Sequence, residues 1–233
     1  MKKSLLILIS FFVLAIPTVD AKEKKVKTVK VKIYTTMGEM KVELYNETPQ
    51  HRDNFIKLVN EGFYEETLFH RVIEEFMIQG GDPYSKLNDP ELRLGSGDLG
   101  YNLDAEIALP TCYHKRGALA AARQGDEQNP EHVSNASQFY LVYGKQYTNS
   151  ELDAVELNVQ KKLSSKENFR FTDEQRLTYK TMGGTPFLDT QYTVFGQLIE
   201  GFDVLQKISE VATGEGDRPK VDIKILRMRI VKK

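Results

Sequence analysis

The first regular pattern in the chain is an alternation of apolar and polar side chains. Val29, Val31 and Ile33 alternate with polar residues, and a second alternating run covers residues 40–44. A turn is expected between the two runs, at residues 37–39. Together they predict a β-hairpin with one buried face.

A helix is expected directly after the hairpin. Thr48 suits the N-cap, and Pro49 suits the first helical position. Apolar residues between 55 and 59 form one face of the helix, and Gly62 is its expected end. His51, in the first turn, is expected on the surface.

Six short apolar runs occupy most of the remaining chain. Clusters of Gly, Asp, Asn and Pro separate them, a spacing typical of an all-β barrel or sandwich. The runs cover residues 68–73, 76–78, 117–122, 139–142, 193–198 and 223–230. A second short helix is predicted over residues 202–208. Strand and helix patterns do not alternate, which argues against a parallel α/β sheet.

Residues 146–182 interrupt the β pattern with two helical segments. The first is predicted over residues 151–163 with Ser150 as its N-cap, and the second begins with a capping box formed by Thr172 and Gln175. A structureless loop of this length would be unusual. We therefore predict a helical insertion in one domain, and favour a solvated helical hairpin over a surface for a partner.

The N-terminus has the pattern of a secretory signal peptide. Two lysines precede an apolar run over residues 5–16, and Ala21 ends a small-x-small cleavage pattern. The run is shorter than the roughly 20 residues that cross a bilayer. We expect residues 1–21 to be removed, residues 22–28 to be a flexible lead-in, and no stable membrane span to remain. The alternative is an uncleaved anchor. Export is expected, with the periplasm as the favoured compartment.

Composition and charge narrow the function classes. Acidic and basic residues number 33 and 32, for a net charge of −1, which argues against strong attraction to nucleic acid. Cys112 is the single cysteine, so no intramolecular disulfide can form. We interpret it as a small buried residue. Four scattered histidines lack metal-ligand spacing, and no Gly-x-Ser-x-Gly elbow occurs, so neither a metal, a cofactor nor acid–base hydrolysis is expected.

Residues 69–82 form the most informative stretch. Arg71 and Gln79 are polar residues among apolar ones, so each needs a hydrogen-bond partner if it is buried, and they could serve each other. Two glycines after Gln79 permit an abrupt bend. The local pattern is equally compatible with a core strand that carries one surface arginine.

This stretch resembles the cyclophilin family of peptidyl-prolyl cis-trans isomerases, and the resemblance continues in order over nearly all of residues 29–231 apart from the insertion. The further matching blocks are Gly100-Tyr101, Glu106-Ile107, Gly117 to Ala122, Ser137 to Tyr140, Phe187-Leu188-Asp189 and Val194-Phe195-Gly196. The resemblance implies a mainly β domain over residues 29–233. Its fold would be a closed eight-stranded antiparallel barrel capped by two helices, with the substrate groove on its outside.

The resemblance also implies which residues form the groove. Arg71 and Gln79 would be catalytic. The implied substrate-binding residues are His70, Phe76, Met77, Ala122, Arg123, Gln138, Tyr140, Phe187, Leu188 and Tyr192. Four of them, Phe76, Met77, Tyr140 and Leu188, would form the apolar pocket for the proline ring.

The implied chemistry follows from the peptide bond. Rotation about it is slow, with a barrier of roughly 18–20 kcal/mol, because resonance gives the C–N bond double-bond character. A donor from Arg71 aimed at the prolyl nitrogen would weaken that resonance without covalent chemistry. Gln79 would hold the guanidinium, while Gln138 and the backbone of Arg123 would hold the flanking substrate chain.

Several groove positions depart from the best-known eukaryotic pattern. Phe187 replaces a tryptophan, so an indole N–H donor is missing and weak cyclosporin binding is expected. Tyr140 replaces phenylalanine, Tyr192 replaces histidine and Arg123 replaces asparagine. Tyr140 and Tyr192 are expected to shift substrate preference or rate, whereas function should survive the replacement at Arg123.

Two functions remain open at this point. The favoured one is an isomerase that assists the folding of exported proteins, acting as a monomer on proline-containing peptides and unfolded or folding chains. The alternative is a binding module that holds such segments as a chaperone with little catalysis, using the helical insertion as extra surface. A structural protein is the third possibility.

Overall fold

The computed structural model describes residues 27–87, 89, 92–163 and 168–231. The predicted signal peptide, residues 1–21, and most of the predicted lead-in lie outside the described residues. None of the described helices is long and apolar enough to cross a membrane.

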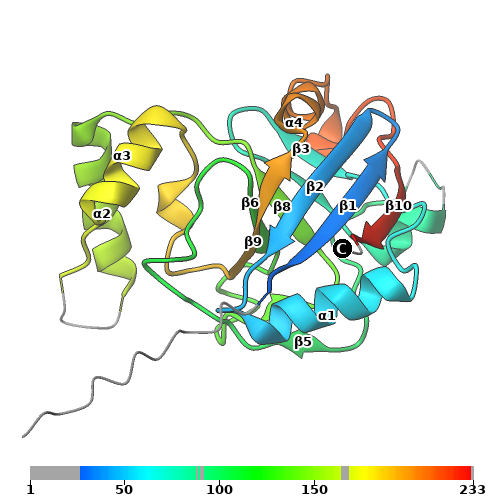
Figure 1. Ribbon diagram of the computed structural model, residues 1–233, viewed down its shortest axis with the longest axis horizontal. Coiled ribbons are helices and arrows are strands. Elements are labelled where there is room, and N and C mark those ends of the chain that lie inside the picture. Colours follow the sequence, from blue (N-terminus) through cyan, green and yellow to red (C-terminus); the bar gives the residue numbers. More distant parts are fainter. Residues whose placement is uncertain (1–26, 88, 90–91, 164–167, 232–233) are drawn as a thin grey trace, which may run out of the picture.

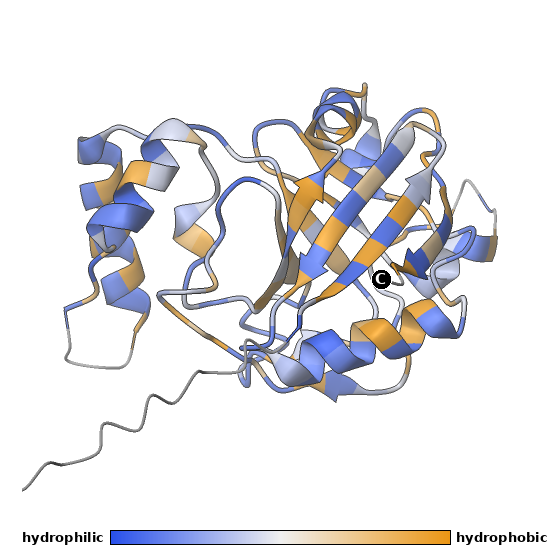
Figure 2. Cartoon of the chain, viewed as in Figure 1, coloured by the Kyte–Doolittle hydropathy of each residue, from blue (hydrophilic) through white to orange (hydrophobic). Residues whose placement is uncertain are grey.

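Eight strands form one antiparallel sheet in the order β10-β1-β2-β9-β6-β8-β4-β3. They are β1 (Val29–Thr35), β2 (Gly38–Leu44), β3 (Arg71–Ile73), β4 (Met77–Gly80), β6 (Ala118–Ala121), β8 (Phe139–Val142), β9 (Val194–Glu200) and β10 (Ile225–Ile230). Each coincides with a predicted run, and the alternation along β1 and β2 is visible in Figure 2. A separate pair was not predicted: β5 (Asn102–Leu103) with β7 (Ser134–Asn135).

The main sheet is curled, but no continuous ladder closes it (Figure 1). Between the edge strands β10 and β3, the structure has an isolated bridge from Leu68 to Lys224 and a bond from the Phe69 N–H to the Ile223 carbonyl, 2.9 Å long. Bonds of 2.8 Å also join the Glu66 N–H to the Ile225 carbonyl and the Ile225 N–H to the Thr67 carbonyl, but residues 66–70 form no regular strand that continues into β3. The prediction of a closed barrel was therefore wrong, and the fold is a half-barrel.

Two helices cover the ends of the curled sheet, as predicted: α1 (Pro49–Asn60) and α4 (Phe202–Ser209) (Figure 1). They bury apolar residues such as Phe55, Leu58 and Leu205 in the core that the sheet surrounds. This burial, rather than local helix propensity, supplies most of their stability.

The N-terminus of α1 is held differently from the prediction. Thr48 is at the N-cap, but its side chain makes no capping bond. Instead the Glu106 carboxylate accepts hydrogen bonds from the backbone N–H groups of Gln50 and His51, and lies 2.6 Å from Nδ1 of the His51 ring. His51 is consequently 2% exposed, so its prediction as a surface residue was wrong.

The predicted helical segment contains α2 (Asn149–Lys162) and α3 (Asp173–Thr181). Thr172 caps α3 through the predicted capping box, whereas α2 is capped by Thr148 and not by Ser150. The two helices lie beside the half-barrel (Figure 1) and have a small apolar cluster of their own. That the segment is an insertion relative to the family that the sequence resembles stays a prediction.

Candidate active site

The hairpin of β3 and β4 places Arg71 directly opposite Gln79. Nη1 of Arg71 donates to Oε1 of Gln79 over 3.5 Å, which is the partnership expected from the sequence. Nε of the same guanidinium donates to Oδ2 of Asp217 over 3.2 Å. Asp217 was not predicted. The Arg71 side chain remains 40% exposed, so its charge is solvated and accessible.

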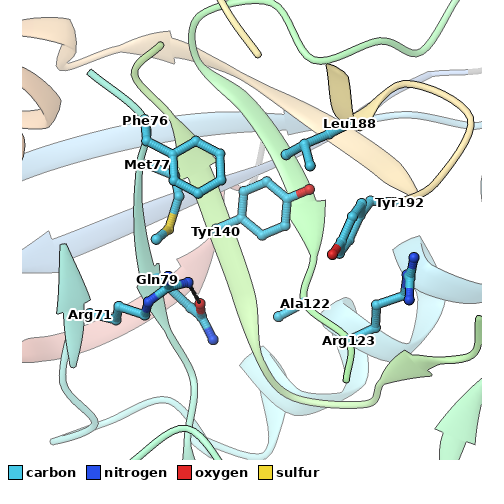
Figure 3. A pocket seen from close by; sticks show the side chains of 9 residues that line it. All are labelled: Arg71, Phe76, Met77, Gln79, Ala122, Arg123, Tyr140, Leu188 and Tyr192. Atoms are coloured by element: carbon cyan, nitrogen blue, oxygen red, sulfur yellow. Dashed lines mark hydrogen bonds between the residues drawn. The ribbon is translucent and has the colours of Figure 1, made fainter. Parts of the chain in front are cut away.

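Arg71 stands at the edge of a pocket in which nine of the twelve predicted residues meet (Figure 3). The lining is Arg71, Phe76, Met77, Gln79, Ala122, Arg123, Tyr140, Leu188 and Tyr192. Tyr140 lies in its middle, between Phe76 on one side and Tyr192 on the other. The pocket thus combines an apolar, aromatic interior with charged donors at its edge, the guanidinium groups of Arg71 and Arg123, which suits a proline ring joined to a polar peptide bond.

Gln138 lies behind this pocket and does not line it. Its Oε1 accepts a bond from Nε2 of Gln79 over 3.0 Å, and its own Nε2 donates to the carbonyls of Gly95 and Gly97. Asp82 accepts from the N–H groups of the same two glycines, which fixes their loop. The Gln138 amide is therefore engaged in orienting Gln79.

The side chain of Arg123 is committed to the rim of the pocket. Its guanidinium lies 4.5 Å from the centre of the Tyr192 ring, a cation–π contact. Nε donates to the Gln191 carbonyl over 3.0 Å, and Nη1 lies 2.8 Å from a carboxylate oxygen of Asp126. Arg123 thereby holds Tyr192 in place.

The other two predicted residues lie just outside the pocket. Phe187 is 40% exposed, and its ring centre is 5.7 Å from that of Phe76, which lines the pocket. His70 is buried behind Arg71, and neither ring nitrogen has a hydrogen-bond partner among the described residues. Burial lowers the pKa of His70 to about 4, so the ring is neutral near pH 7.

Sequence reasoning missed the partners of Tyr140. Its hydroxyl lies 2.9 Å from Nε2 of His114, and Nδ1 of His114 lies 2.7 Å from Asp189. Neither pairing is local, so no periodicity or spacing signals it. Cys112 is buried as predicted, and burial raises its pKa to about 12, which keeps the thiol protonated. No group of three His, Cys, Asp or Glu side chains in the described part of the chain is placed to hold a metal ion.

Residues 29–230 match the family described as "Cyclophilin type peptidyl-prolyl cis-trans isomerase/CLD". Peptidyl-prolyl cis-trans isomerase CYP18-1 of Arabidopsis thaliana is 30% identical over 86% of this chain and 94% of its own length. A putative isomerase of Staphylococcus haemolyticus is 32% identical over 88% and 92%. A putative bifunctional phosphatase/isomerase of Streptococcus pyogenes is 35% identical, but this chain spans only 37% of it.

Solved structures give the same result. A Cryptosporidium parvum cyclophilin type isomerase has a TM-score of 0.63 at 26% identity, with 89% of this chain and 99% of that chain covered. Its structure in the presence of the dipeptide Ala-Pro has a TM-score of 0.62 at the same identity, covering 88% of this chain and 99% of that chain. The chain belongs to the cyclophilin-type peptidyl-prolyl cis-trans isomerases.

Proposed function

We propose that this isomerase accelerates rotation about Xaa-Pro bonds non-covalently, with Arg71 acting on the prolyl nitrogen. The planar bond resists rotation because the nitrogen lone pair is delocalised into the carbonyl. An N–H donor directed at that nitrogen favours the twisted, pyramidal state over both planar isomers. Binding that is stronger in the transition state than in either ground state is what raises the rate.

The position of the Arg71 guanidinium carries this proposal. It stands beside the apolar pocket that suits a proline ring, so a donor would lie close to the nitrogen of a bound proline. A guanidinium has five N–H groups. Its contacts with Gln79 and Asp217 use two of them, and the other three have no partner among the described residues, so they can face a substrate.

Exchange NMR on an Ala-Pro-containing peptide, with catalytic amounts of protein, tests the proposal. Arg71→Ala should lower kcat/KM by about a hundredfold or more, the scale of losing one transition-state donor. Arg229→Ala, which removes an exposed arginine on β10, is the matched control and should leave the rate unchanged. Full activity of Arg71→Ala would refute the proposed role. Peptide binding without any acceleration by the native protein would favour the chaperone-like binding module.

We also propose that the protein assists the folding of exported proteins. The basic start, apolar run and cleavage pattern of residues 1–21 support this proposal. Expression of the full chain in a bacterium, followed by fractionation and mass spectrometry, should yield a periplasmic species that lacks residues 1–21. A full-length product confined to the cytoplasm would contradict it.

A further inference from the structure

A continuous chain of buried hydrogen bonds connects the proline pocket to helix α3. The Tyr140 hydroxyl is 2.9 Å from Nε2 of His114, and Nδ1 of His114 is 2.7 Å from Oδ1 of Asp189. The Tyr179 hydroxyl, from α3, donates to Oδ2 of Asp189 over 2.6 Å. All four side chains are at most 4% exposed.

The direction of each bond in this chain follows from its chemistry. Burial raises the pKa values of Tyr140 and Tyr179 well above their usual range, so both hydroxyls keep their protons and can donate. Asp189 accepts from the Tyr179 hydroxyl and also from the backbone N–H of His114, over 2.9 Å. The His114 proton therefore belongs on Nδ1, facing the carboxylate, and Nε2 accepts from Tyr140.

Ring contacts restrict Tyr140 further. The His114 and Tyr140 rings are nearly parallel, at 12° with centres 6.0 Å apart, and Tyr192 meets both rings edge-on. The Tyr140 hydroxyl points away from Arg71 and Gln79 (Figure 3). The hydroxyl thus anchors the far end of the ring, whereas the face of the ring is left for the proline.

We propose that His114, Asp189 and Tyr179 are positioning residues that fix the Tyr140 ring in the proline pocket. This inference rests on the isomerase site proposed above. It gives the segment of α2 and α3 a part in the reaction, because Tyr179 holds the carboxylate that orients His114. A phenylalanine at position 140 could not be held in this way, since it has no hydroxyl for His114 to accept from.

A double-mutant cycle on Tyr140→Phe and Tyr179→Phe tests the proposal through isomerase kinetics. Tyr140→Phe should lower kcat/KM about threefold to tenfold, the scale of one lost buried hydrogen bond, mainly through a higher KM. Tyr179→Phe should act in the same direction. In the Tyr140→Phe background it should have no further effect, because the hydroxyl through which it acts is already gone.

Tyr113→Phe is the matched control. It removes a hydroxyl that donates to Thr178 of α3 over 3.1 Å and does not bond to Asp189, so it should leave the kinetics unchanged. Equal losses from Tyr179→Phe in both backgrounds would overturn the proposal, because Tyr179 would then act independently of the Tyr140 hydroxyl. No loss in either background would overturn it as well.

Two further measurements separate this proposal from the one on which it rests. Nitrogen-15 NMR of the His114 ring should show the proton on Nδ1 in the native protein, and a proton on Nε2 alone would contradict the assigned bond directions. Arg71→Ala, assayed in parallel, reports on the proposed chemistry. If that variant keeps full activity while the cycle shows coupling, the role of Arg71 fails and the positioning of Tyr140 stands.

Discussion

Arg71, on one side of the pocket, keeps 40% of its side chain exposed and is held by bonds of 3.2 and 3.5 Å. Tyr140, in the middle of the same pocket, is 4% exposed, and the chain behind it has bonds of 2.6–2.9 Å. The charged donor is thus solvated and loosely held, whereas the surface for the proline ring is dry and closely tied to its surroundings.

Because of this difference, the Arg71 side and the Tyr140 side of the pocket should contribute differently to stability and to the reaction rate. An exposed ion pair such as Arg71 with Asp217 contributes about 0–1 kcal/mol to folding, so its removal should barely affect stability. Buried polar groups that lose a partner cost far more, because they cannot turn to water. Substitutions on the Arg71 side should therefore change the rate, and substitutions behind Tyr140 should also change the free energy of unfolding.

The largest expected effect on stability comes from Asp189→Ala. It leaves three buried donors unpaired: the His114 ring, the His114 backbone N–H and the Tyr179 hydroxyl. At about 1–3 kcal/mol for each orphaned group, we expect a loss of about 3 kcal/mol or more in unfolding free energy. Urea denaturation followed by circular dichroism measures it, provided that the m-value is unchanged.

Two variants calibrate this loss. Lys207→Ala removes a cation whose side chain is 59% exposed, and Arg71→Ala removes the half-exposed cation. Each should change the unfolding free energy by about 0.5 kcal/mol or less, the usual effect of a surface substitution. The contrast between the two sides of the pocket would be lost if Asp189→Ala were no more destabilising than these two.

The sequence predicted those features that depend on neighbouring residues. The eight strands of the main sheet follow from apolar runs of the right length and alternation. The pairing of Arg71 with Gln79 was also accessible, because a tight hairpin brings residues eight positions apart into register. Thr172 capped its helix because a capping box is complete within four residues.

The features that the sequence did not predict depend on distant parts of the chain. Asp217 reaches Arg71 across 146 residues, and Asp189 reaches His114 across 75. His51 was assigned to the surface because Glu106, which buries and bonds it, comes 55 residues later. The prediction of a closed sheet failed for a similar reason, since closure depends on how residues 66–69 meet residues 223–225, far along the chain.

A smaller effect on the free energy of unfolding is expected from a change of pH, through the ring of His70 behind Arg71. Burial lowers the folded-state pKa of His70 from 6.5 to about 4. As the pH falls below 6.5 the unfolded chain binds a proton that the folded protein does not, so stability falls until about pH 4. Between pH 6.5 and 4.5 the loss assigned to His70 should be about 2 kcal/mol.

Comparison with His70→Gln isolates this contribution from that of the carboxyl groups. The variant has no titrating ring, so its unfolding free energy should depend less steeply on pH over that range. Parallel slopes for the native protein and His70→Gln would show that the His70 ring accepts a proton in the fold as readily as in the unfolded chain.

The smallest effect is expected beside Phe76, where Phe187 lies just outside the pocket. Phe187 is 40% exposed beside Phe76, where the best-known eukaryotic members carry tryptophan. Phe187→Trp would add an indole N–H donor over an otherwise similar aromatic surface, and we expect cyclosporin to bind about threefold to tenfold more tightly. Titration calorimetry measures the change, with Phe202→Trp, on α4, as the control. If the native protein already binds cyclosporin with nanomolar affinity, tight binding does not require the missing N–H donor, and the aromatic surface of Phe187 alone is sufficient for it.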